Sequence, residues 1–233
     1  MSTQRTLIAP LSAFLVALLF VAAAQAQQIF ADGFESGDVS AWSKARKPKG
    51  LDVNGAAART GDFGLEILSD RGRTGVQDNS PRREDAYMVE FFFDPDNLEM
   101  RLKKRIDILQ LMGKGGKGTH VRLLLKQLGD NLFELRLLAR DNSGRFRFIG
   151  SAEVRRNEWT LVSVLWARAG TNGLDQGLAA LFTDGILRGE KGNLDNDRLT
   201  IDTVRLGLLK KAGAAKNGSY YLDDFSSFRT LAP

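Results

Sequence analysis

Apolar and polar residues alternate with a period of two in many short segments of this chain, and turn-forming residues separate the segments. Such alternation is typical of strands that have one face in a core and the other in water. The turn sequences LGDN (128–131), DNSG (141–144) and TDG (183–185) contain residues that tolerate positive φ or bond their own backbone. The expected strands are Gly64–Ser69, Tyr87–Asp94, Ile106–Met112, His120–Lys126, Leu132–Arg140, Arg145–Ile149, Trp159–Arg168, Leu178–Thr183, Thr203–Leu208 and Tyr220–Arg229.

Many short strands with few helices predict an all-β protein. We expect a jelly-roll β-sandwich of two curved antiparallel sheets. The ends of the chain, at 29–43 and 219–230, are expected to supply its first and last strands and to pair. The segment Pro95–Arg105 is the best candidate for a helix or a lobe between strands. Neither a repeat nor a linker interrupts the pattern, so residues 27–233 are predicted to form one domain.

The first 26 residues are predicted to be a secretory signal peptide. Arg5 supplies a positive charge, residues 7–24 are almost wholly apolar, and Ala24-Gln25-Ala26 is a small-x-small cleavage site. No later apolar stretch approaches the roughly 20 residues that a membrane helix needs. The mature protein is therefore expected to begin at Gln27, to lack a membrane span, and to be secreted or periplasmic in a bacterium.

Composition narrows the choice of ligands. Cysteine is absent and histidine occurs once, which excludes disulfides and disfavours a zinc site. Lys and Arg number 33 against 28 Asp and Glu, and the net charge of +5 favours anionic partners such as an acidic polysaccharide. Nucleic acid is not expected as a partner, because no binding motif accompanies the basic residues and the chain is predicted to be exported.

The same alternation assigns faces to the strands. In Leu132–Arg140 the odd-numbered positions are apolar and are expected in the core. In Arg145–Ile149, Phe146 and Phe148 are expected in the core and the arginines outside. The predicted outward basic row is Arg122, Lys126, Arg136, Arg140, Arg145 and Arg147. Arginine forks bind carboxylates and sulfates, so this row predicts an anion-binding groove; the alternative is an ordinary solvated face.

Motifs in the second half of the chain resemble a known family. They are a tryptophan that opens a strand (Trp159), a DG hairpin (184–185), the strand IDTVRLG (201–207) and the closing YLDDF (221–225). Together they resemble concanavalin A-like lectin/glucanase domains of the laminin-G-like kind. The terminal segments are also similar to calcium-containing carbohydrate-binding modules. Both resemblances imply a jelly-roll fold and a tendency to bind carbohydrate, with extracellular or cell-wall polysaccharide as the partner.

Four carboxylates lie in the terminal segments, namely Asp32, Glu35, Asp223 and Asp224. These side chains would converge if the terminal strands pair, and calcium prefers about six to eight oxygen ligands. In the modules that these segments resemble, a Glu of the opening motif and an Asp of the closing motif bind a structural calcium. The resemblance therefore implies a calcium site. The alternative is that the aspartates hydrogen-bond the backbone near a strand crossing.

Aromatic side chains are a second kind of candidate. Trp166 is the candidate sugar-binding platform, because an exposed tryptophan offers flat apolar area to a pyranose ring. A buried Trp166 is the alternative. Trp42 and Trp159 are expected to be core anchors near strand ends.

Catalysis has less support in the sequence. The paired carboxylates of jelly-roll glucanases, in the pattern E-x-D-x-x-E, are absent. His120, Arg122 and Gln110, with a tyrosine of the last strand, would resemble the set by which jelly-roll polysaccharide lyases neutralise a uronate and remove a proton. We therefore expect a secreted, non-catalytic, lectin-like domain for acidic polysaccharide. The alternatives are a lyase for a uronate-containing glycan and a structural or surface-interaction protein.

Overall fold

The computed structural model describes residues 26–171, 176–210 and 212–230. The predicted signal peptide lies outside these residues except for its last position. Strands make up 60% of the structure and helical turns 7%, which confirms the prediction of an all-β protein. The helical turns are all short 3-10 segments, namely η1 (Pro48–Gly50), η2 (Gly55–Ala57), η3 (Ser69–Arg71), η4 (Lys114–Gly116) and η5 (Ala212–Ala214).

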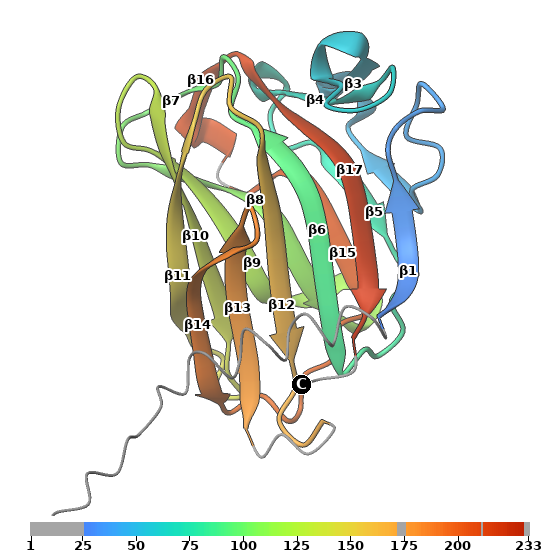
Figure 1. The fold of residues 1–233 in the computed structure, drawn as a ribbon, viewed down its shortest axis with the longest axis vertical. Helices are drawn as coiled ribbons and strands as arrows, with labels where there is room; N and C mark the ends of the chain where they lie inside the picture. The colour runs from blue at the N-terminus through green and yellow to red at the C-terminus, as the bar shows by residue number, and fades with distance from the viewer. Residues whose placement is uncertain (1–25, 172–175, 211, 231–233) are drawn as a thin grey trace, which may run out of the picture.

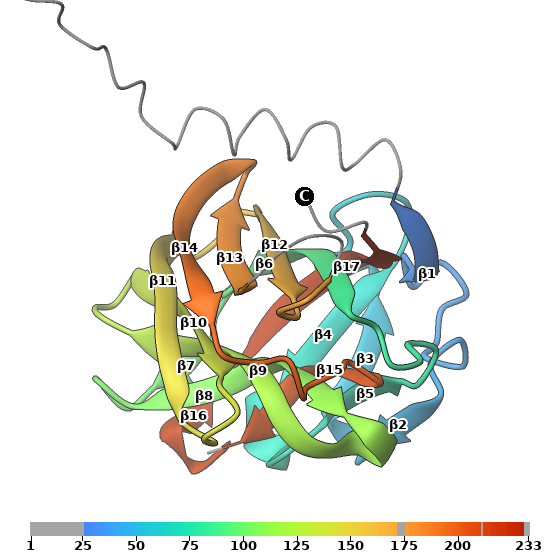
Figure 2. The ribbon, with the colours of Figure 1, turned by 90° about the horizontal axis from the view of Figure 1, so that it is seen from below.

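Two large antiparallel sheets pack face to face as a β-sandwich, with the layers visible in Figures 1 and 2. The eight-stranded sheet runs in the order β14 (Ile186–Leu194), β13 (Gly177–Thr183), β12 (Thr160–Ala167), β6 (Ala86–Asp94), β17 (Ser219–Arg229), β4 (Gly64–Leu68) and β3 (Leu51–Asn54), with β1 (Gln27–Asp32) beside β17. The seven-stranded sheet runs in the order β11 (Phe146–Arg155), β10 (Leu132–Arg140), β9 (Lys117–Gln127), β8 (Arg105–Gly113), β15 (Thr203–Lys210), β5 (Gly75–Asp78) and β2 (Lys44–Arg46). A two-stranded ribbon joins β7 (Glu99–Met100) to β16 (Ala215–Asn217).

The core lies between the two sheets and is built from the apolar alternate positions of their strands. On β10 the inward residues are those predicted from the alternation, and each is fully buried: Phe133, Leu135, Leu137 and Ala139. The facing sheet contributes Val89, Phe91 and Phe93 from β6. Burial of these rows is the main favourable contribution to folding, since the structure contains no disulfide.

Strand β17 joins the two ends of the chain. On one side it pairs with β6, and on the other it pairs with β4 through Ser219–Leu222 and with β1 through Phe225–Arg229. The predicted pairing of the terminal segments is therefore confirmed. Trp42 is buried next to this pairing, with its ring centroid 4.9 Å from that of Phe225, and acts as the predicted core anchor.

The structure adds strands that the alternation did not indicate. Pro95–Arg105, predicted as a helix or lobe, consists of turns around the short strand β7 and contains no helix. Strand β14, the edge of the eight-stranded sheet, was not expected because its sequence is mostly polar and exposed. Gly150 of β11 and Gly189 of β14 let the two sheets approach closely at this edge: a Cβ on Gly150 would lie 2.7 Å from the Cα of Gly189.

The core assignment predicts a large cost for truncating Phe91, which is fully buried. Phe91→Ala should lower the free energy of unfolding by about 3–5 kcal/mol, because it loses buried apolar area and leaves a cavity. Urea denaturation of the purified protein measures the change. Ile186→Ala is the control, since Ile186 is 55% exposed and its truncation should change stability by about 0.5 kcal/mol or less. Equal losses in the two variants would contradict the assigned core.

Candidate functional site

The side of the seven-stranded sheet that faces away from the core is a polar and aromatic surface, which we call the outer face. One row of successive cross-strand partners crosses this whole sheet from β2 to β11. Its members are Lys44, Gln77, Arg205, Gln110, Arg122, Leu138 and Phe148. Neighbours in such a row have Cβ atoms about 4.5–5.5 Å apart, so they form a continuous strip.

A buried carboxylate organises the centre of the outer face. Asp107 is 0% exposed and accepts two hydrogen bonds from the Arg122 guanidinium, from Nε at 2.8 Å and from an Nη at 2.7 Å. It also accepts one from Gln110 Nε2 at 2.8 Å. Two parallel hydrogen bonds hold the Arg122 guanidinium in one orientation. Breaking this buried pair would leave an uncompensated charge, which is costly.

Two phenylalanines stand on the outer face and correct a prediction. Phe146 and Phe148, expected in the core, are 36% and 48% exposed. The cause is a register shift in the β10–β11 pair: Leu137 pairs with Gly150 and the next residue, Leu138, pairs with Phe148. The extra residue, Ile149, reverses the alternation beyond it, so residues predicted inside turn outward.

The same shift removes Arg145 and Arg147 from the predicted basic row. Arg147 is paired in register with Ala139, an inward position, and its Nε donates to Asp141 Oδ2 at 2.7 Å. Arg145 lies in the turn before β11, where its backbone N–H donates to Asp141 Oδ1. Neither arginine therefore belongs to the outer face.

The two outward rings are each covered by an arginine. The Arg136 guanidinium lies 4.4 Å from the centroid of the Phe148 ring, and that of Arg122 lies 5.3 Å from the Phe146 ring. Cation–π attraction holds each planar cation against an aromatic face. The sequence did not indicate Phe146 and Phe148 as surface residues, because strict alternation assigns them to the core.

The structure brings four of the six predicted basic residues to the outer face, namely Arg122, Lys126, Arg136 and Arg140. The Nζ atom of Lys126 lies 3.6 Å from Oε2 of Glu134 on the neighbouring strand. Arg140 lies near the glycine-rich turn at 113–118, with an Nη atom 3.6 Å from where a Cβ on Gly118 would be.

A further cation on this face, Arg205, was treated in the sequence only as part of a fold motif. Its Nε donates to Gln77 at 2.6 Å. Burial lowers the pKa of Arg205 from its ordinary value, and the positive charge of Arg46 lowers it further. A half-buried guanidinium beside a second cation is a favourable place for an anionic group.

Trp166 does not serve as a platform in this structure. Its side chain is 0% exposed and packs in the core with Val162 and Val164, on the inward face of β12. The even-numbered residues of β12 face inward, so the outward positions belong to Leu161 and Leu165. Trp159 is half-buried, and its ring centroid lies 6.3 Å from that of Tyr221.

The residues proposed for a lyase do not assemble into one site. His120 is buried against the glycine-rich turn, and burial, together with the Arg140 charge, lowers its pKa. Gln110 and Arg122 are both engaged by Asp107. The tyrosines of the last strand belong to the other sheet, so none of them faces His120.

The four predicted calcium ligands lie at the β1–β17 edge and bind protein donors. Asp32 accepts from Phe34 N and from Trp42 Nε1. Glu35 accepts from the backbone N–H groups of residues 62 and 63, Asp223 from those of residues 59 and 60, and Asp224 from the hydroxyl of residue 60. Among the residues with described positions, no three acidic or histidine side chains gather as metal ligands would. Glu35, Asp223 and Asp224 thus hold the loop at 59–63. Calcium binding at these carboxylates stays a prediction of the sequence.

The fold and the outer face together define a β-sandwich domain with a basic, aromatic surface on one sheet. No helix in the described part of the chain is both long and apolar enough to cross a membrane.

No protein-family model and no curated protein matches the chain. Several solved structures share its fold. The cellulose induced protein Cip1 superposes with a TM-score of 0.59 and 13% identity, over 85% of this chain and 96% of that one. Domain 4 of AbnA, a GH43 extracellular arabinanase from Geobacillus stearothermophilus, was solved in complex with arabinotriose. It superposes with a TM-score of 0.54 and 12% identity, over 89% of this chain and 95% of that one. The binding domain of Paraclostridial Mosquitocidal Protein 1 superposes with a TM-score of 0.57 and 12% identity, over 89% of this chain and 50% of that one. At these identities the likeness establishes the fold alone.

The calcium prediction can be tested by melting the protein in calcium and in chelator. Calcium bound at the predicted site should raise the Tm relative to chelator, because an ion that binds only the folded state stabilises it, and Glu35→Ala should abolish the difference. The same Tm in both conditions for both proteins would contradict the calcium prediction. A bound ion at about ten times its dissociation constant would add about 1.4 kcal/mol of stability, which a melting curve resolves.

Asp141 predicts a specific pH dependence of stability. Hydrogen bonds from Ser143, and then from Arg147 and the Arg145 backbone, lower the pKa of Asp141 from 3.8 to about 2. A carboxyl group with a lowered pKa stabilises the fold above its ordinary pKa, and the contribution is lost as the pH falls towards 2. Asp141→Asn should therefore be less stable than the wild type at pH 7, with a difference that shrinks between about pH 4 and pH 2. Urea unfolding across this range measures the difference, and a difference that does not change with pH would contradict a stabilising role for the charged Asp141 carboxylate.

Proposed function

We propose that this protein is a non-catalytic module that binds an acidic polysaccharide on the outer face. The observation that carries the proposal is the pair of exposed rings backed by arginines. Phe148 is 48% exposed with Arg136 at 4.4 Å from its centroid, and Phe146 is 36% exposed beside Arg122. An aromatic ring stacks on the apolar face of a pyranose, while a neighbouring guanidinium binds a carboxylate or sulfate of the same chain.

The charge balance of the outer face supports an acidic ligand over a neutral one. Arg136, Arg140 and Arg205 have no carboxylate within ion-pair distance among the described residues, whereas Arg122 and Lys126 do. Unpaired guanidinium groups beside an aromatic surface favour a ligand that carries negative groups at intervals.

The fold neighbours support carbohydrate as the ligand class, without locating a site. One neighbour is domain 4 of an extracellular arabinanase in complex with arabinotriose, and another is a cellulose induced protein. A fold shared at about one-eighth identity is a weak reason to transfer a ligand, so the outer face itself carries the argument.

The proposal is tested by affinity electrophoresis through gels that contain polygalacturonate, a neutral glucan or no polymer. The wild type should be retarded only by polygalacturonate. Phe148→Ala and Arg136→Gln should each weaken binding by about 3- to 10-fold, because each removes a stacking or charge-assisted contact worth about 0.7–1.4 kcal/mol. The gels are then stained for glycan, and intact staining is expected.

Two matched controls and two contrary outcomes complete this test. Phe63→Ala and Lys191→Gln remove an exposed ring before β4 and an exposed cation on β14, both strands of the other sheet, and should bind like the wild type. A cleared zone in the glycan stain would favour a polysaccharide lyase. Free migration of the wild type through every gel would remove the support for a glycan ligand and favour a structural or surface-interaction role.

A further inference from the structure

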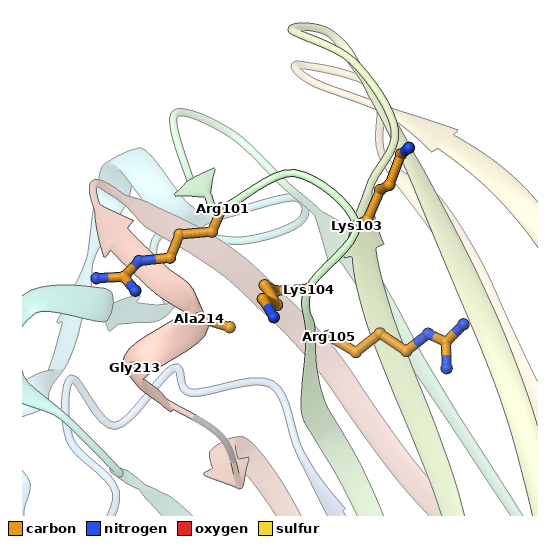
Figure 3. Close-up of a pocket in the computed structure, with 6 residues that line it drawn as sticks. All are labelled: Arg101, Lys103, Lys104, Arg105, Gly213 and Ala214. Carbon is orange, nitrogen blue, oxygen red and sulfur yellow. The ribbon is translucent and has the colours of Figure 1, made fainter.

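From the end of β7 to the first residue of β8 the chain has the sequence RLKKR, with four cations in the five residues 101–105, which we call the basic loop. Arg101, Lys103, Lys104 and Arg105 line a cavity of about 540 Å³ together with Gly213 and Ala214 (Figure 3). The loop is absent from the predicted basic row because Pro95–Arg105 was expected only as a helix or lobe.

The basic loop is fixed from two sides by hydrogen bonds. Arg101 N donates to Ala214 O at 2.8 Å, and Lys104 N donates to Arg101 O at 3.0 Å. Directly before the loop, Met100 N donates to the buried side chain of Gln127 at 2.7 Å. A loop held in this way presents its charges with a small ordering cost when a ligand binds.

The charges of the basic loop are uncompensated. Within the ranges that the structure describes, none of its four cations has an acidic group within ion-pair distance, whereas Arg122, Arg168 and Arg229 each hold one. The Nε of Arg105 is buried and lacks a hydrogen-bond partner among the described atoms. Clustered like charges repel one another, so an anionic ligand that neutralises them is favoured.

The directions of the side chains select the shape of the ligand. Arg101 and Arg105 extend to opposite sides of the loop, and Lys104 lies between them near Ala214 (Figure 3). Side chains that point apart in this way match a linear chain with several negative groups better than one compact anion. Leu102, which is 61% exposed, offers an apolar contact between the cations.

The basic loop is continuous with the outer face. Arg105 opens β8 and is the cross-strand partner of Lys126. Lys126 is four residues from Arg122 along β9, and a strand rises about 3.3 Å per residue, so about 13 Å separate their Cα atoms. A polysaccharide on the outer face can therefore reach the loop without leaving the surface of the sheet.

We propose that the basic loop is a second anion-binding subsite, which takes the carboxylate or sulfate groups of a linear acidic polysaccharide that also lies on the outer face. This inference deepens the proposed function and depends on it for the identity of the polymer. The negatively charged groups of the polymer, rather than its sugar rings, are the recognised feature of this subsite.

The test uses a loop variant in which Arg101, Lys103 and Lys104 are all replaced by glutamine. Its control variant carries Arg82→Gln, Lys191→Gln and Arg198→Gln, which removes three exposed cations outside the loop and gives the same net charge. Dissociation constants are measured over a salt series for polygalacturonate, dextran sulfate and sugar-free polyphosphate. The loop variant should bind each polyanion about tenfold more weakly at low salt. The slope of log K against log salt should fall by about 2, because three fewer cations release counterions.

The results separate this inference from the proposed function. Equal affinities in the loop and control variants would overturn the inference. A loss of affinity in the loop variant, but not in the control variant, supports the inference. The role of the outer face is decided separately by Phe148→Ala, which should weaken the binding of polygalacturonate but not of polyphosphate, because polyphosphate has no sugar ring to stack on Phe148. Binding of the wild type only to vesicles of anionic phospholipid, and not to polyanionic chains, would also overturn the inference. The Tm of each variant is measured first. If the Tm of the triple loop variant is lower than that of the wild type, the single variant Lys104→Gln replaces it.

Discussion

The register of the β10–β11 pair determines what the outer face presents. In an antiparallel pair each residue points to the side opposite its neighbour, so one extra residue exchanges the two sides for the rest of the strand. Ile149 is that extra residue, and it moves Phe146 and Phe148 from the core side to the outer face. A regular pairing would have placed two arginines outward there and left the surface without rings.

Asp107 determines how the arginines on that surface are held. Its carboxylate is fully buried although it faces the outer side of the sheet, and Arg122 and Gln110 cover it. Two charges out of water are costly unless they are well paired, so the geometry around Asp107 is rigid. Arg122 is consequently fixed in position, and its guanidinium lies over the Phe146 ring.

The sequence was sufficient for the class of fold and for most strands, since each expected strand overlaps an observed one and the chain ends pair as expected. It failed where the outcome depends on a partner strand. The register shift at Ile149 involves β10 as much as β11, so alternation within β11 alone could not indicate it. The sequence left open whether Trp166 is buried or exposed for a related reason. Which side of β12 faces the core depends on how β12 pairs with β6 and β13.

The candidate site was predictable in its charge but not in its composition. Four cations of the predicted row lie on the outer face, because charged residues on alternating strands point away from the core wherever the register is regular. Arg205 and the basic loop were missed for a different reason: the first belonged to a strand defined by its apolar residues, and the second to a segment without alternation. A run such as RLKKR between two strands is in itself a signal of concentrated charge.

The cations of this surface fall into two groups, and the division explains how it can both keep its shape and bind a ligand. Arg122 and Lys126 have carboxylate partners and contribute to the structure of the sheet. Arg136, Arg205 and the basic loop have none among the described residues, and they lie on both sides of the paired group. An extended polyanion would therefore neutralise the unpaired cations without breaking an existing ion pair. A compact anion would meet only one part of this arrangement, so length and charge spacing, more than the identity of the sugar, are the properties for which this surface selects.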